Sequence, residues 1–267
     1  MDLWSLYETD DGDNIVAIFE HRDRVRKIYL PFRTTSLVSE RLVTMMQEPF
    51  PALTYLHLEA ECDGPALPDM FLDGSAPRLQ SLELWGIPFP GLPRLLLSAT
   101  EISFVSLERI PYNGYISPEV MVTCLSTLTR LRYLSIKFEF PTSRPDRRDR
   151  RPPPLPRVIL SSLQGLEFRG VSGYLEDLVA QIDAPRLDSL HISFFNQLIF
   201  DIQQLPQFIG RTGILRSYNR TEVVFGRHSV KIVLRLAELA NSHQEPTLEI
   251  LCKDIDWQVL CMAQICS

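Results

Sequence analysis

Residues that could carry out catalysis are present in this sequence, but they do not fall into a catalytic pattern. No segment matches a phosphate-binding glycine loop, a GxSxG nucleophile turn, an HExxH zinc motif or a Cys/His zinc cluster. The tripeptide His21-Arg22-Asp23 resembles the start of a kinase catalytic loop, but the asparagine that should follow, the glycine-rich loop and the DFG motif are missing. The five histidines share no ligand-like spacing. We therefore expect a non-catalytic protein with no cofactor and no metal; an enzyme whose catalytic residues converge from distant positions is the alternative.

The composition is that of a folded chain with a modest acidic charge. The 267 residues carry a net charge of −6, with 45% hydrophobic and 22% charged residues, which excludes wholesale disorder. The acidic balance argues against a protein that binds nucleic acid or an anionic membrane through global charge. The longest uncharged run, residues 189–200, is shorter than the roughly 20 residues that span a bilayer.

The N-terminal segment and the cysteines bear on where the protein resides. Residues 1–13 are acidic and lack the basic start and apolar core of a signal peptide. The five cysteines are widely scattered and form no CxxC pair, so they are expected to be reduced thiols. We expect a cytoplasmic or nuclear protein.

One apolar pattern recurs along the chain: an apolar residue, two free positions, an apolar residue, one free position and an apolar residue. Copies start 20 to 32 residues apart, which centres on the leucine-rich-repeat range. The segments 76–82 and 184–190 are nearly identical, both opening with Ala-Pro-Arg-Leu. The copies are Val25/Ile28/Leu30, Leu53/Leu56/Leu58, Leu79/Leu82/Leu84, Leu131/Leu134/Ile136, Leu163/Leu166/Phe168 and Leu187/Leu190/Ile192, with a weaker copy at Ala99/Ile102/Phe104.

Each copy ends in the alternation of a short strand, and helical spacing follows several copies. The end of the pattern places apolar side chains on one face and free side chains on the other. Helices are predicted at 36–47, 118–128 and 174–182. Because one strand and one helix cannot bury their apolar faces alone, stacked copies should form an irregular α/β leucine-rich-repeat solenoid. Its parallel strands would line the concave face and its helices the convex face; an ordinary α/β domain with leucine-rich strands is the alternative.

Two regions interrupt the repeats and set the domain boundaries. Residues 143–157 combine six arginines, two aspartates and many prolines, so we expect a disordered surface insertion in a repeat domain of residues 1–212. The other interpretation of this loop is a nuclear-localisation or nucleic-acid patch, which the aspartates and the lack of lysine and aromatic residues disfavour. Residues 213–267 are predicted to form diverged repeats or a C-terminal cap. This region has strands at 222–225, 229–234 and 247–252 and a closing helix at 256–265.

The free positions of the predicted strands should form a ladder across the concave face. Aromatic residues and arginine are enriched at binding hot spots, so Tyr55, Trp85 and Tyr133 are the best candidates for anchors. The alternative is a solvated sheet, or one that a tail covers. In the weaker copy the free positions are Glu101 and Ser103. The candidate binding residues are Tyr29, Tyr55, His57, Glu59, Glu83, Trp85, Tyr133, Lys137, Glu167, Arg169 and His191.

Four segments resemble the repeat portion of the large fungal F-box-like leucine-rich-repeat family. They are residues 13–25, 47–58, 76–84 and 250–258. The resemblance implies a substrate-recognition subunit of a cullin-RING ubiquitin ligase. In such a subunit an F-box docks on a Skp1-type adaptor and the repeats hold a protein target.

The sequence departs from the family pattern at the docking element and within the repeats. No segment before Val25 has room for an F-box, so we expect binding to a Skp1-type adaptor only if an F-box is encoded upstream. We expect an unknown protein target on the concave face, and neither nucleic acid nor membrane as a partner. A stand-alone repeat scaffold unrelated to ubiquitination is the alternative function. The asparagine or cysteine of regular repeats is replaced by Glu61, Ile87, Glu139, Val171 and Phe195.

Overall fold

The computed structural model describes most of the repeat region and part of the C-terminal region. The described residues are 2–3, 21–32, 43–44, 46–60, 65–139, 157–195, 202–213, 215, 220–227, 229–235 and 246–251. The predicted closing helix 256–265 and the predicted insertion, except Arg157, lie outside them. Of the predicted helix 36–47, only residues 43–44 and 46–47 are described.

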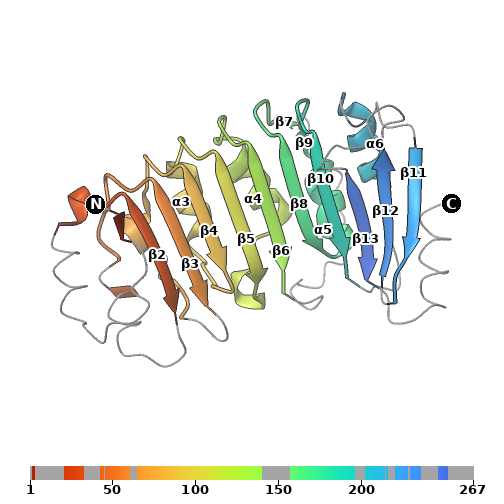
Figure 1. Ribbon diagram of the computed structural model, residues 1–267. Coiled ribbons are helices and arrows are strands. Elements are labelled where there is room, and N and C mark those ends of the chain that lie inside the picture. Colours follow the sequence, from red (N-terminus) through yellow and green to blue (C-terminus); the bar gives the residue numbers. More distant parts are fainter. Residues whose placement is uncertain are drawn as a thin grey trace.

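The chain has a mixed α/β fold built on one large sheet (Figure 1). Seven full strands lie parallel and follow one another in chain order. They are β2 (Lys27–Phe32), β3 (Tyr55–Ala60), β4 (Ser81–Trp85), β5 (Phe104–Ile110), β6 (Tyr133–Phe138), β8 (Gly165–Gly170) and β10 (Ser189–Phe194). The short strand β1 (Asp2–Leu3) pairs in parallel with β2. A second sheet pairs β7 (Val158–Ile159) with β9 (Ile182–Asp183).

The C-terminal strands extend the large sheet and introduce antiparallel pairing into it, because β12 (Ser229–Arg235) runs opposite to the other strands (Figure 1). Strand β13 (Thr247–Leu251) pairs in parallel with β10. Strands β12 and β11 (Arg220–Phe225) then continue the sheet in antiparallel pairing. The three strands predicted in this region are therefore confirmed to within two residues at their ends.

Helices cover one face of the sheet and lie behind it in the view of Figure 1. They are α3 (Leu92–Ser98), α4 (Pro118–Leu125), α5 (Ser172–Val179) and α6 (Gln204–Arg211), and each packs against the next. Short 3₁₀ helices occur at η1 (Arg22–Arg24), η2 (Phe71–Gly74) and η3 (Tyr112–Gly114). The predicted helices 118–128 and 174–182 are confirmed as α4 and α5, although Ile182 belongs to β9. Within the described residues, no helix is long and apolar enough to cross a bilayer.

The helix α4 shows how the sequence sets these boundaries. Ser117 precedes the helix and its Oγ accepts a hydrogen bond from the backbone N–H of Val120 at 3.4 Å. Pro118 occupies the first helical position, where a backbone N–H would have no partner within the helix, so the lack of this group in proline costs nothing. The helix buries Met121, Val122 and Leu125 against the sheet.

The core lies between the sheet and the helices and is made of the repeated apolar positions. All three apolar residues of the six strong copies are buried, which confirms that part of the prediction. A backbone turn precedes each copy; for example, the N–H of Leu79 donates to the carbonyl of Ala76 at 3.0 Å and that of Leu187 to Ala184 at 3.2 Å. The same turn recurs through the sheet and fixes where each strand begins.

The alignment of the weaker copy with the repeat pattern, which we call its frame, was predicted wrongly: it is displaced by three residues. The apolar positions are Ile102, Val105 and Leu107, all buried, and Phe104 lies on the opposite face of β5. The turn explains the shift, because the N–H of Ile102 donates to the carbonyl of Ala99 at 3.2 Å. Ala99 therefore occupies the position that Ala76 and Ala184 hold in their copies.

A backbone hydrogen-bond ladder supports the corrected frame. The residue after the first apolar position of each copy donates its N–H to the equivalent residue of the preceding copy. Ser103 donates to Gln80 at 2.9 Å, and Arg132 donates to Ser103 at 2.8 Å. Ser103 therefore belongs to this backbone ladder and not to the predicted binding face. Glu101 lies in the turn and forms an ion pair with Arg130.

Gly86 offers a test of how tightly the chain turns at the end of β4. Its φ is +65°, and a Cβ atom there would lie 2.5 Å from the backbone oxygen of Ala60. We expect Gly86→Ala to lower the free energy of unfolding by about 2 kcal/mol, because left-handed backbone strain adds to a clash with a rigid partner. Equilibrium urea denaturation measures the loss.

Gly210 provides the matched control in the same protein. It lies inside α6, and a Cβ atom added there would meet no heavy atom within 4 Å. Gly210→Ala should therefore raise the free energy of unfolding by about 0.5–1 kcal/mol. Equal effects of the two substitutions would contradict the tight turn at Gly86.

Candidate functional site

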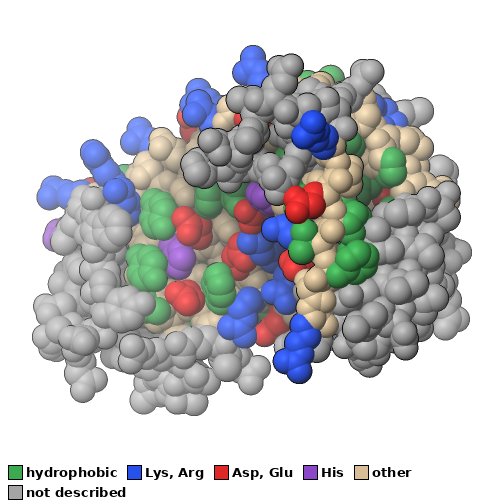
Figure 2. All heavy atoms as spheres, turned by 45° about the vertical axis from the view of Figure 1, so that its right-hand side comes forward, with side chains coloured by type: hydrophobic (Ala, Val, Ile, Leu, Met, Phe, Trp, Pro, Cys, Tyr) green, Lys and Arg blue, Asp and Glu red, His purple; other side chains and the backbone are tan. Residues whose placement is uncertain are grey.

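The strand register brings all eleven candidate binding residues onto the face of the sheet that lies opposite the helices, but not Glu101 and Ser103 of the weaker copy. We call the outward positions of β2, β3, β4, β5, β6, β8 and β10 the open face. Figure 2 shows acidic, basic and histidine side chains gathered there among hydrophobic ones. The paired residues form three rows across the strands. The upper row is Lys27, Tyr55, Ser81, Phe104, Tyr133, Gly165 and Ser189; the middle row is Tyr29, His57, Glu83, Ser106, Ser135, Glu167 and His191; the lower row includes Glu59, Trp85, Glu108, Lys137 and Arg169.

At the β2–β4 end, His57 is held between two carboxylates. Its Nδ1 lies 2.9 Å from Glu83 Oε2, and its Nε2 lies 3.8 Å from Glu59 Oε2. The Tyr29 ring stacks on the imidazole with 4.4 Å between centroids, and the Tyr29 hydroxyl donates to Glu59 Oε2 at 3.5 Å. These contacts fix the side chains of three neighbouring strands in one arrangement, which we call the His57 cluster.

Tyr55 extends the His57 cluster to the upper row. Burial, followed by the charge and hydrogen bond of Glu83, raises the pKa of Tyr55 to about 12. The hydrogen bond with His57 is the largest influence on Glu83 and lowers the pKa of that carboxyl group. Glu83 is therefore a fixed anion at neutral pH, and Tyr55 remains a neutral hydrogen-bond donor.

In the centre of the open face, Lys137 joins two glutamates into a second cluster. Its Nζ lies 3.0 Å from Glu108 Oε1 and 2.5 Å from Glu167 Oε2. Glu108 Oε1 also accepts hydrogen bonds from the hydroxyls of Ser106 at 3.1 Å and Ser135 at 3.0 Å. We call these five residues the Lys137 cluster.

The charges of the Lys137 cluster stabilise one another against burial. Partial burial by itself would lower the pKa of Lys137, but the hydrogen bonds to Glu167 and Glu108 outweigh it and raise that pKa. Burial would raise the pKa of Glu167, but hydrogen bonds from Lys137 and Tyr133 lower it. Burial is the largest influence on His191, which lies beside Glu167 in the middle row, and it lowers the pKa of that imidazole.

The lowered pKa values of Glu83 and Glu167 predict a pH dependence of stability. A carboxyl group with a lower pKa in the folded state stabilises the fold above its unfolded pKa, near 4.5. This contribution is lost as the pH falls through the folded pKa. We expect Glu83→Gln and Glu167→Gln each to reduce the loss of stability between about pH 5 and pH 3. Urea denaturation across that range tests this, and Glu48→Gln, at an exposed ion pair with Arg22, is the control.

Aromatic side chains provide the apolar part of the open face. Phe104 and Tyr133 stack nearly parallel, with 4.8 Å between ring centroids and an interplanar angle of 8°. Gly165 makes room for this stack, because a Cβ atom there would lie 2.6 Å from Tyr133 Cδ2. Further along, the guanidinium of Arg169 lies 5.5 Å from the centroid of the Phe195 ring.

The sequence frame missed the part of the open face that β5 contributes. Phe104, Ser106 and Glu108 belong to the three rows, whereas Glu101 and Ser103 had been predicted there. Arg109 follows as an extra residue with φ of 49°, at a register shift between β5 and β6, and its Nη2 lies 2.8 Å from Glu139 Oε1. The sequence signal that could have corrected this alignment is Ala99, which precedes Ile102 by three residues, as Ala76 precedes Leu79 and Ala184 precedes Leu187.

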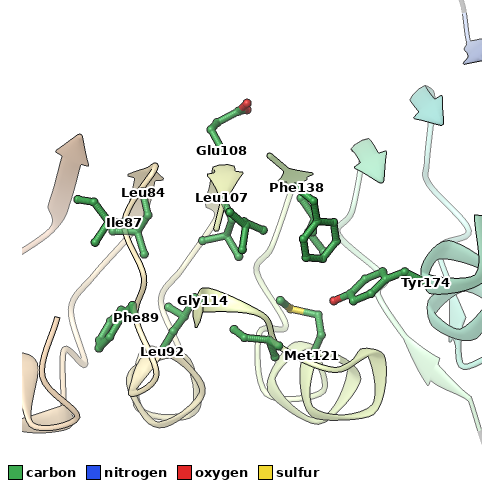
Figure 3. A pocket seen from close by; sticks show the side chains of 13 residues that line it. Leu84, Ile87, Phe89, Leu92, Leu107, Glu108, Gly114, Met121, Phe138 and Tyr174 are labelled. Carbon is green, nitrogen blue, oxygen red and sulfur yellow. The ribbon is translucent and has the colours of Figure 1, made fainter. Parts of the chain in front are cut away.

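A small cavity lies on the other side of the sheet, in the core (Figure 3). In that view Leu107 and Glu108 project from opposite sides of β5. The cavity has a volume of about 20 Å³, which is room for about one water molecule. Its lining is largely apolar, and the Tyr174 side chain reaches it from α5. The space is too small for a substrate.

The groups of the open face can form ion pairs, hydrogen bonds and aromatic contacts. On the open face, the charged groups of both clusters are engaged with one another. Cys124 is buried, and burial raises its pKa to about 11, so it is a poor nucleophile. Among the described residues, no three His, Cys, Asp or Glu side chains are placed to hold a metal ion. No protein-family model, curated protein or solved structure matches this chain.

Proposed function

We propose that this chain is a non-catalytic, leucine-rich-repeat-like solenoid whose open face binds a protein. The observation that carries the proposal is the continuous set of three rows on seven parallel strands. These rows combine aromatic rings with charged groups that are partly exposed. Extended sheet surfaces of this kind are the usual binding surfaces of repeat proteins.

The internal pairing of the open face supports a role in recognition. The His57 cluster and the Lys137 cluster fix side chains that would otherwise rotate freely. A partner that binds a preorganised surface loses less conformational entropy than one that must order it. Aromatic side chains add contact area to this fixed pattern of charge.

The resemblance to the F-box-like family supports a more specific role. We propose that the open face holds a protein target for a cullin-RING ubiquitin ligase, in the cytoplasm or nucleus, and that it binds neither nucleic acid nor membrane. This role requires a connection to a Skp1-type adaptor. A stand-alone scaffold outside the ubiquitin system is the alternative. Co-purification of a Skp1-type adaptor with the natural gene product would favour the ligase, and its absence would favour the scaffold.

Site-specific photocrosslinking tests the binding face directly. A photoreactive benzoylphenylalanine would replace Phe104 on the open face in one variant and Val120 on α4 in the other, and both would be expressed in the source cells. Val120 is 41% exposed and lies on the helix side, so it reports background capture. We expect a protein that crosslinks at position 104 and not at position 120.

The binding of the captured protein to the purified chain should then depend on the residues of the open face. We expect Phe104→Ala to weaken its binding at least tenfold in calorimetry, as for a hot-spot aromatic, and Val120→Ala to leave the affinity unchanged. Equal crosslinking at both positions, or equal affinities of the two variants, would overturn the proposal.

A further inference from the structure

The exposed tryptophan of the open face lies between two carboxylates. Trp85 is the last residue of β4, and its side chain is 38% exposed. In the strand register it is paired with Glu59 of β3 on one side and with Glu108 of β5 on the other. Neighbouring strands are about 4.8 Å apart, so both carboxylate-bearing residues flank the indole directly. We call Trp85, Glu59 and Glu108 the Trp85 site.

Both flanking carboxylates retain acceptor capacity. The contacts of Glu108 with Ser106, Ser135 and Lys137 all go to Oε1. The contacts of Glu59 go to Oε2 and are long, at 3.5 Å from the Tyr29 hydroxyl and 3.8 Å from His57 Nε2. Among the described residues, the second oxygen of each carboxylate has no such contact.

The surrounding charge is negative on this part of the open face. The outward positions of β3, β4 and β5 carry three glutamates, Glu59, Glu83 and Glu108, and no lysine or arginine. Lys137 from β6 is shared between Glu108 and Glu167, and Arg109 from the bulge pairs with Glu139. Lys137 therefore compensates the charge of Glu108 only in part, and among the described residues Glu59 has no ion pair with a lysine or arginine.

We infer that the Trp85 site binds a lysine or arginine side chain from an extended segment of the protein partner. This inference rests on the proposed function and names the chemistry of its partner. An indole face attracts a cation through the ring quadrupole, and carboxylates on either side accept its N–H groups.

Other segments fit this site less well. An acidic segment would be repelled by the three glutamates. A purely apolar segment would remove the carboxylates from water without giving them a partner. A cationic side chain alone satisfies both the indole and the carboxylates.

A small probe tests the site even while the protein partner is unidentified. The probe is N-acetyl-arginine N-methylamide, added to the full 267-residue chain, and the readout is the indole Nε1–H signal of Trp85 in ¹⁵N-correlated NMR spectra. The variant Trp85→Phe assigns that signal. We expect a saturable shift with a dissociation constant of roughly 10–100 mM, as for one cation–π contact together with two charged contacts at an exposed site. The citrulline analogue, which has the same shape without the charge, should give no saturable shift.

Charge-neutral variants test the contribution of the two carboxylates. We expect Glu59→Gln and Glu108→Gln each to weaken arginine binding about threefold or more, as for loss of one exposed charged contact. Glu101→Gln, which alters a carboxylate in the turn outside the open face, should leave the dissociation constant unchanged. Since Glu59 makes only long contacts, its variant keeps the test independent of the Lys137 cluster.

The outcomes separate this inference from the proposed function. Equal shifts with arginine and citrulline, or unchanged binding in both glutamine variants, would overturn the cationic assignment. If crosslinking at position 104 still captures an open-face partner in that case, the proposed function stands. If crosslinking also shows no preference for the open face, both fail.

Discussion

Replacing Leu107 with alanine is expected to lower the free energy of unfolding by about 3 kcal/mol. Leu107 is 2% exposed and is paired in register with Leu84 on β4 and Ile136 on β6. It also lines the 20 Å³ cavity, so the lost methyl groups would enlarge a space that is already present. The cost of such a substitution rises with the volume of the cavity left behind.

Phe104→Ala is the decisive comparison, because the two frames of β5 predict opposite results. Phe104 is partly exposed on the open face, where it stacks on Tyr133. Its loss should cost about 1 kcal/mol, the value of a surface aromatic pair. In the frame predicted from the sequence, Phe104 would be a core residue and its loss would cost about 3–5 kcal/mol. Equilibrium urea denaturation of both variants measures the two costs, and a larger loss for Phe104→Ala would contradict the structure.

The strands of the six strong copies could be predicted because leucine dominates their buried positions. In Leu163/Leu166/Phe168, for example, no shift of up to three residues places large apolar residues at all three positions. At β5 two frames satisfy the apolar pattern, since Ala99/Ile102/Phe104 and Ile102/Val105/Leu107 both fit. A backbone hydrogen bond from Ile102 to Ala99 decides between them, and an apolar pattern carries no information on such a bond.

The residues of the open face could be predicted one by one outside β5, but the contacts between their side chains could not. Strand alternation is enough to place Glu83 and His57 on one face. The contact between them depends on the register of β3 against β4, which tertiary packing sets. Glu108 was not predicted on this face, because the alignment of β5 with the repeat pattern was wrong. Its carboxylate contacts Lys137 and the hydroxyls of Ser106 and Ser135.

The direction of the C-terminal strands had a local signal. Strands β11 and β12 are separated by residues 226–228 only, and Gly226 donates its N–H to the carbonyl of Ser229 at 2.8 Å. A connection this short can join only antiparallel strands, because a parallel pair needs a long crossover. The antiparallel pairing of β11 with β12 therefore follows from the loop length, which the repeat pattern does not include.

Replacing Glu176 with alanine is expected to lower the free energy of unfolding by about 2–4 kcal/mol. Glu176 lies on α5, is 5% exposed, and reaches the start of α6. Its Oε2 accepts the N–H of Gln204 at 2.5 Å, and its Oε1 accepts that of Leu205 at 2.9 Å. The first N–H groups of a helix have no partner within the helix and carry a partial positive charge. One carboxylate thus satisfies two of these groups and joins elements 28 residues apart.

The loss should extend to the packing of α6, since Leu205 and Phe208 of this helix are buried in the core. Hydrogen exchange should therefore accelerate across residues 204–211 before it does in β6 or β8. Glu176→Gln should cost about half as much, because its amide retains one acceptor oxygen and turns an NH₂ group toward the other N–H. Glu101→Ala, at an exposed ion pair with Arg130, is the control and should cost less than about 1 kcal/mol. Equal losses for Glu176→Ala and Glu101→Ala would show that other groups satisfy the start of α6.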